Sequence, residues 1–92
     1  MNFKQFQDTR KKMSNPKDSE SYTEGVIGAF VYLDSFMEGY GITESICIEI
    51  FDDKLPYYIM IDRSDYQTDN LEKLEKLLYS FCLEEGYIEV QA

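Results

Sequence analysis

The sequence lacks histidine and tryptophan, and it has only two cysteines and two prolines in 92 residues. Without histidine, the commonest general base and the commonest metal ligand are absent. Cys47 and Cys82 each lie within an apolar pattern, so we expect two buried thiols and no disulfide. Catalysis by a histidine-activated nucleophile is therefore excluded.

The sequence also lacks a long apolar run. The longest one, residues 25–33, falls far short of the ~20 residues that cross a bilayer. Residues 1–8 lack the apolar core of a signal peptide. We therefore expect a cytoplasmic protein with no membrane partner.

Basic residues are few and unevenly placed. Nine of them face 18 acidic residues, which gives a net charge of −9. Residues 1–17 carry a net charge of +4, and residues 18–92 carry a net charge of −13. We interpret the chain as one domain, 1–92, in which a basic amphipathic arm (1–15) joins an acidic α+β body (23–92). The charge of the body argues against direct binding of nucleic acid.

Two helices are predicted before the first strand. In the arm, Asn2 can cap a helix whose apolar face carries Phe3, Phe6, Arg10 and Met13. We expect this face to pack on the body, and its exchange between two protomers of a homodimer is the alternative. A second helix over residues 23–40 is predicted from a stripe of Val26, Phe30, Leu33, Met37 and Tyr40. The β-branched and aromatic run 26–33 leaves a strand open there.

The second half of the chain predicts a hairpin, a helix and a last strand. Isoleucines alternate through residues 46–51 and 57–62, with a turn by composition between them. Asp69 can cap a third helix that ends at Gly86 and whose stripe is Leu71, Leu74, Leu78, Phe81 and Cys82. Residues 87–90 are predicted as a short strand.

These elements predict an α+β fold. The order is α-α-β-β-α-β in a single two-layer domain. A right-handed crossover through the third helix would set the last strand beside the first. The prediction is a small antiparallel sheet of order 2-1-3 with the helices mainly on one face.

The sequence contains no complete catalytic motif. Asp62, Ser64, Asp65 and Asp69 crowd one predicted loop as calcium ligands would, but the calcium-loop pattern requires Gly at position 67 and Glu at position 73. The triplet 52–54 resembles the end of a nuclease motif, but a hairpin turn explains it. There is no glycine-rich phosphate loop. We therefore predict a non-enzymatic protein with no catalytic residues, metal site or cofactor.

Carboxylates and tyrosines remain as the candidate binding groups. Eight tyrosines exceed what a core of this size needs, and tyrosine is favoured at contact hot spots. An acidic surface also serves solubility without any partner. The predicted partner-binding set is Asp62, Asp65, Tyr66, Asp69, Glu72 and Glu75 with Tyr58.

Size and charge are those of the inhibitors carried by phages and mobile elements, of the anti-CRISPR or anti-restriction type, although no motif is shared with them. The hypothesis is that this protein blocks the basic nucleic-acid site of a nuclease or effector by charge mimicry. Its alternatives are an immunity protein or antitoxin bound to a cognate toxin, and an accessory subunit of a larger assembly.

Overall fold

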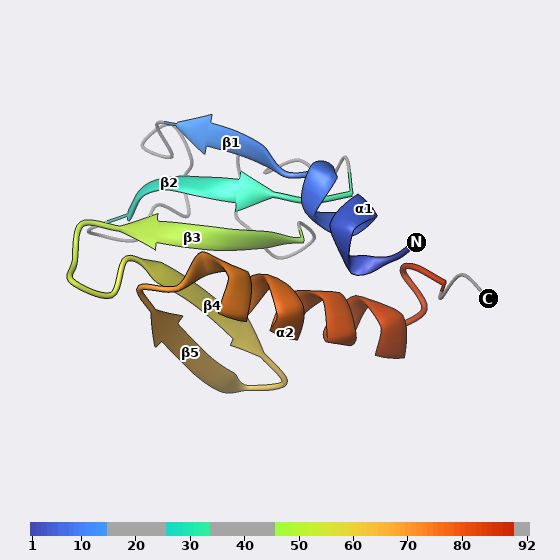
Figure 1. The fold of residues 1–92 in the computed structure, drawn as a ribbon. Coiled ribbons are helices and arrows are strands. Elements are labelled where there is room, and N and C mark those ends of the chain that lie inside the picture. Colours follow the sequence, from blue (N-terminus) through green and yellow to red (C-terminus); the bar gives the residue numbers. More distant parts are fainter. Residues whose placement is uncertain (15–25, 34–45, 90–92) are drawn as a thin grey trace.

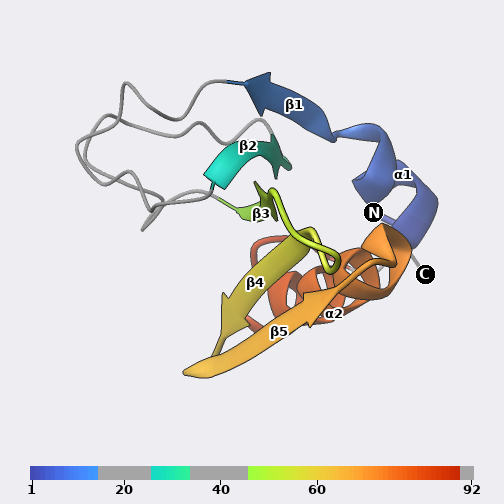
Figure 2. The same ribbon diagram turned by 90° about the vertical axis from the view of Figure 1, so that its left-hand side faces the viewer.

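The computed structural model describes residues 1–14, 26–33 and 46–89 (Figure 1). They form a five-stranded antiparallel sheet of order β1-β2-β3-β4-β5, and both helices lie on the same side of it (Figure 2). In chain order the elements are α1 (Phe3–Asp8), β1 (Lys11–Ser14), β2 (Val26–Val31), β3 (Cys47–Phe51), β4 (Tyr57–Ile61), β5 (Ser64–Thr68) and α2 (Leu71–Glu84).

The α+β class is confirmed, but the predicted element order and the 2-1-3 strand order are wrong. The 2-1-3 order required a strand at residues 87–90 that returned to the middle of the sheet. Residues 87–89 form no strand, and residue 90 lies outside the described residues. Each strand instead pairs antiparallel with its neighbour in the chain, so no later strand is inserted between earlier ones.

The segment predicted as a buried helix from Val26 onward is the strand β2. It pairs with both β1 and β3, so it is an interior strand. Ala29 and Val31 on one face are buried, and Phe30 on the other face packs against the core. A strand that is covered on both faces has apolar residues at every position, so its sequence loses the alternation that identifies strands. The rest of the predicted helix, residues 34–40, lies outside the described residues.

The N-terminal helix begins as predicted and ends early. The Asn2 side chain accepts a hydrogen bond from the Gln5 backbone, and the Gln5 side chain accepts one from the Asn2 backbone, each at 2.8 Å. The helix ends at Thr9, whose hydroxyl donates to the Phe6 carbonyl at 2.7 Å and accepts from the Leu33 amide at 2.9 Å. A helix that continues to Met13 is therefore wrong, because the chain turns into β1 and pairs with β2.

The β3–β4 hairpin and the helix α2 are confirmed. The cap of α2 is Asn70 and not Asp69, since the Asn70 side chain accepts from the Lys73 amide. Gly86 adopts φ 78°, a left-handed conformation suited to glycine, just beyond the end of the helix.

The isoleucine face of the hairpin and the leucine stripe of α2 form one core, as predicted, and α1 adds Phe6 to it. Each fully buried aliphatic or aromatic side chain contributes roughly 1.5–3 kcal/mol to folding. The buried members are Phe6, Tyr32, Ile48, Ile59, Leu74, Leu78, Cys82 and Ile88. Among the described residues, neither helix has the length and apolar character needed to span a membrane.

Candidate functional site

The segment predicted as a loop after residue 62 is a second hairpin. β5 pairs with β4 over its whole length, from Ile61↔Ser64 to Tyr57↔Thr68. Asp62 and Arg63 make the turn, with φ of 50° and 68°. A two-residue turn with positive φ at both positions matches the right-handed twist of the strands, although it usually contains Asn and Gly. The strand β5 was not predicted from the sequence, because its side chains are mostly polar and exposed and show no apolar alternation.

On the face of this hairpin opposite α2, a tyrosine and a carboxylate are joined. Ile59 belongs to the core under α2, so Tyr58 and Met60 beside it point to the opposite face. The Tyr58 hydroxyl donates to Asp65 Oδ1 at 2.6 Å. This hydrogen bond, with a smaller effect of burial, raises the pKa of Tyr58 to about 12. Two of the predicted binding residues, Tyr58 and Asp65, are therefore in direct contact.

The same face continues onto β3. Glu49 lies across from Tyr58, and the Phe51 ring meets the Tyr58 ring edge to face at 5.7 Å between centroids. Burial raises the pKa of Glu49, and its Oε2 atom is buried with no hydrogen-bond partner in the described part of the chain. Sequence reasoning left Glu49 out of the binding set, although its position in an alternating strand placed it on this face.

The remaining acidic candidates lie at the two ends of β5. Asp62 is exposed at the hairpin turn, whereas Asp69 and Glu72 are exposed at the start of α2. Glu72 pairs with Lys76 at 3.6 Å, one helical turn away. Tyr66 lies on the α2 side of β5 and is 38% exposed. Apart from the Tyr58–Asp65 pair, the predicted set is thus arranged around the hairpin and not on a single face.

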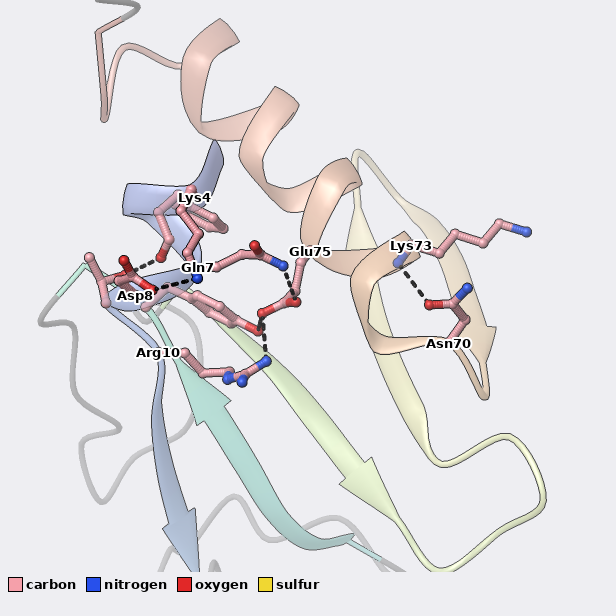
Figure 3. A network of polar contacts seen from close by, with 10 residues as sticks. Lys4, Gln7, Asp8, Arg10, Asn70, Lys73 and Glu75 are labelled. Atoms are coloured by element: carbon pink, nitrogen blue, oxygen red, sulfur yellow. Dashed lines mark hydrogen bonds and ion pairs between the residues drawn. The ribbon is translucent and has the colours of Figure 1, made fainter. Parts of the chain in front are cut away.

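Glu75 is buried, with 1% of its surface exposed, so its predicted exposure is wrong. Its Oε1 accepts from Gln7 Nε2 at 3.1 Å. Its Oε2 accepts from the Tyr32 hydroxyl at 2.7 Å and forms an ion pair with the Arg10 guanidinium at 3.1 Å. Figure 3 shows Gln7 and Arg10 converging on Glu75 from α1 and the segment that follows it.

A signal for this burial was present in the sequence. Glu75 stands four residues after Leu71 and three before Leu78, so it occupies the apolar stripe of α2. A carboxylate in that stripe needs a partner from elsewhere in the chain, because an unpaired buried charge costs several kcal/mol. Arg10, at a stripe position of the predicted arm, is that partner. Tyr32 completes the network, and its pKa is raised by burial and then by its hydrogen bond to Glu75.

Both cysteines are free, buried thiols. Burial, with a smaller effect of Glu49, raises the pKa of Cys47 to about 12, and burial raises that of Cys82 to about 11. A thiol with a raised pKa is a poor nucleophile at neutral pH because little thiolate is present. Neither cysteine is thus prepared for covalent chemistry.

Within residues 1–14, 26–33 and 46–89, no three side chains of the metal-binding types gather closely enough to hold an ion. The hairpin surface carries carboxylates, phenol groups and exposed apolar area. No protein-family model matches the sequence, and no curated protein or solved structure matches it significantly.

Proposed function

We propose that this protein is a non-enzymatic binding protein that uses the β4–β5 hairpin and the start of α2 to occupy a basic site on another protein. The observation that carries the proposal is the composition of this surface. Met60 is 61% exposed on the face of the hairpin opposite α2, Tyr66 is 38% exposed on the α2 side, and four exposed carboxylates lie along the same hairpin and at the start of α2. These carboxylates belong to Asp62, Asp65, Asp69 and Glu72.

The two kinds of group have separate tasks in association. Carboxylates facing Lys and Arg accelerate encounter and give specificity, and their effect falls with added salt. Buried aromatic and apolar contacts supply most of the binding free energy. In this hairpin the Tyr58–Asp65 hydrogen bond holds a phenol and a carboxylate together, so both tasks can be performed by one preorganised pair.

The partner class that suits this surface is a nuclease or effector whose nucleic-acid site is lined by Lys and Arg. Such a site holds phosphates spaced along a backbone, and carboxylates spaced along a hairpin can take their place. Inhibitors of the anti-CRISPR or anti-restriction type act in this way in phages and mobile elements, and we place the protein with them. The absence of histidine and the unreactive thiols support a binding role over a catalytic one.

The test begins with capture of the partner from the native host by the tagged full chain, followed by mass spectrometry. We expect an enzyme that binds nucleic acid, and we expect this protein and nucleic acid to exclude one another on it. Simultaneous binding of both would overturn charge mimicry. A cognate toxin or a subunit of a larger assembly as the partner would overturn the inhibitor role in favour of those alternatives.

Matched charge reversals locate the surface. Asp69→Lys with Glu72→Lys changes the proposed surface, whereas Glu84→Lys with Glu85→Lys makes the same charge change at the far end of α2, where both residues are exposed. The first pair should slow association at least about tenfold more than the second, because close charge pairs dominate steering. Equal effects would leave only net charge and would overturn the assignment of the surface. Circular dichroism and chemical denaturation confirm that both variants remain folded.

A further inference from the structure

The strand β5 lies at one end of the sheet, and in the described part of the chain it pairs only with β4 (Figure 1). In a hairpin with a two-residue turn, the residues that flank the turn exchange hydrogen bonds, and so does every second pair after them. Here those pairs are Ile61↔Ser64, Ile59↔Tyr66 and Tyr57↔Thr68. The backbone N–H and C=O groups of the two intervening residues, Asp65 and Gln67, therefore point away from the sheet.

The β5 edge of the sheet is acidic. Residues 57–72 contain four carboxylates and one basic side chain, Arg63. Asp65 is exposed in the middle of the strand, and Asp62 and Asp69 are exposed beyond its two ends. Like charges on opposed strands are destabilising, so two copies of β5 would repel one another. Lys or Arg opposite Asp65 would be favourable.

We propose that an extended basic segment of the partner protein adds to β5 as a further antiparallel strand. The inference rests on the proposed function and names the part of the partner that is bound. The outward backbone groups of Asp65 and Gln67 supply hydrogen bonds that do not depend on sequence. Asp65 selects a cationic side chain on the face opposite α2, where the exposed Met60 adds apolar contact area.

The probe is a short synthetic peptide in which Lys and Val alternate, blocked at both ends. It is added to the ¹⁵N-labelled full chain, and amide hydrogen exchange is followed residue by residue. At saturation the Asp65 and Gln67 amides should exchange about tenfold more slowly or better, because bound amides exchange only from the free form. The Tyr66 amide, which already donates to β4, should change much less.

Two controls separate hydrogen bonding from charge. The same peptide with a methyl group on every backbone nitrogen keeps its charges, but it cannot donate to the Asp65 and Gln67 carbonyls and its methyl groups prevent the close approach of a paired strand. It should therefore give no protection. In the protein, Gln67→Pro removes an outward N–H and leaves the hydrogen bonds to β4 in place. Gln67→Ala is its matched control, since both variants lose the side-chain bond to the Leu55 carbonyl. Binding of the unmethylated peptide should be lost in Gln67→Pro and kept in Gln67→Ala.

Three other results would each overturn the proposal that a basic segment adds to β5 as a strand. Equal binding of the methylated peptide would show attraction by charge alone, which leaves the proposed function standing. No protection at Asp65 and Gln67 would overturn the inference directly. Protection that rises with protein concentration in the absence of peptide, together with dimers in sedimentation, would show that a second copy of the chain occupies this edge. Failure of the proposed function is read separately, from the captured partner and the charge reversals.

Discussion

At the β1 end of the sheet, near α1, one carboxylate is turned inward, whereas at the β5 end the carboxylates are turned outward. Arg10 and Glu75 meet at 3.1 Å over the core, and Gln7 and Tyr32 complete the hydrogen bonding of the carboxylate. Asp65 instead lies on an exposed strand with one phenol as its partner.

The difference shows that a strongly acidic sequence does not imply uniformly exposed acids. A buried carboxylate is stable only with several donors, and it fixes the elements that supply them. Glu75 in this way ties α1 and the end of β2 to α2. An exposed carboxylate costs little and remains available for binding. The Glu75 network at the first end therefore contributes to stability, and the exposed carboxylates at the second end remain available for contacts.

The largest expected effect is the loss of a core side chain at the first end. Phe6 is completely buried and stacks on Tyr32 with 5.0 Å between ring centroids. Phe6→Ala should lower the free energy of unfolding by about 3–5 kcal/mol, from lost burial and a residual cavity. Chemical denaturation measures it.

The matched change at the second end is Tyr66→Ala, which removes a partly exposed ring from β5. It should lower the free energy of unfolding by roughly 1 kcal/mol or less. Similar losses in the two variants would contradict the contrast between the ends.

A smaller effect is expected from the buried ion pair, and it should be asymmetric. Arg10→Ala leaves the Glu75 carboxylate buried without its cation, and it should lower the free energy of unfolding by about 3 kcal/mol. Glu75→Gln should lower it by about 1–2 kcal/mol, because the Arg10 side chain is 39% exposed and can be hydrated. Denaturation at neutral pH compares the two variants.

The control is Lys4→Ala, which breaks the exposed Lys4–Asp8 pair and should change stability by less than about 0.5 kcal/mol. If Arg10→Ala cost no more than Lys4→Ala, the pair would not support the fold.

The smallest effect concerns the titration of Tyr58, whose pKa is raised to about 12 from an ordinary value of 10.0. Because the folded state favours the neutral phenol, this contribution to stability is complete below pH 10 and is lost as the pH rises toward 12. Asp65→Asn should move the pKa of Tyr58 back toward 10, since the charged acceptor of its hydrogen bond is replaced by a neutral amide. Carbon-13 NMR of the tyrosine ring follows the titration.

Asp62→Asn at the hairpin turn is the matched control, because it removes a nearby charge and leaves the Tyr58–Asp65 bond intact. Equal shifts in the two variants would show that the general field of the hairpin, and not the hydrogen bond, sets this pKa.

Elements with a clear local signal were predicted from the sequence, and elements without one were not. The helix α2 has both an apolar stripe and a side-chain cap, and the β3–β4 hairpin has alternating isoleucines. β2 is apolar at nearly every position, so helix and strand fit its pattern equally well. β5 has no apolar pattern, and its existence depends on a turn at Asp62 and Arg63 that lacks the usual residues.

The candidate site, too, was predictable from the sequence in part. The choice of the segment after Tyr58 as a binding surface needed only its composition of acids and tyrosines. The contact between Tyr58 and Asp65 could not be predicted, because it requires the register of a hairpin that the sequence did not reveal. The alternation of β3 indicated the face of Glu49, but its position across from Tyr58 is defined only by pairing between strands.

The sequence by itself determined the class of the fold, the two buried thiols, the cap at Asn2, and the core shared by the hairpin and α2. These depend on local spacing, which the order of residues sets directly. Only the tertiary structure decided the strand order, the edge position of β5 and the burial of Glu75. Each of these depends on which segments meet in space. Arg10 and Glu75 are 65 residues apart, so no local pattern could show that one charge is the partner of the other.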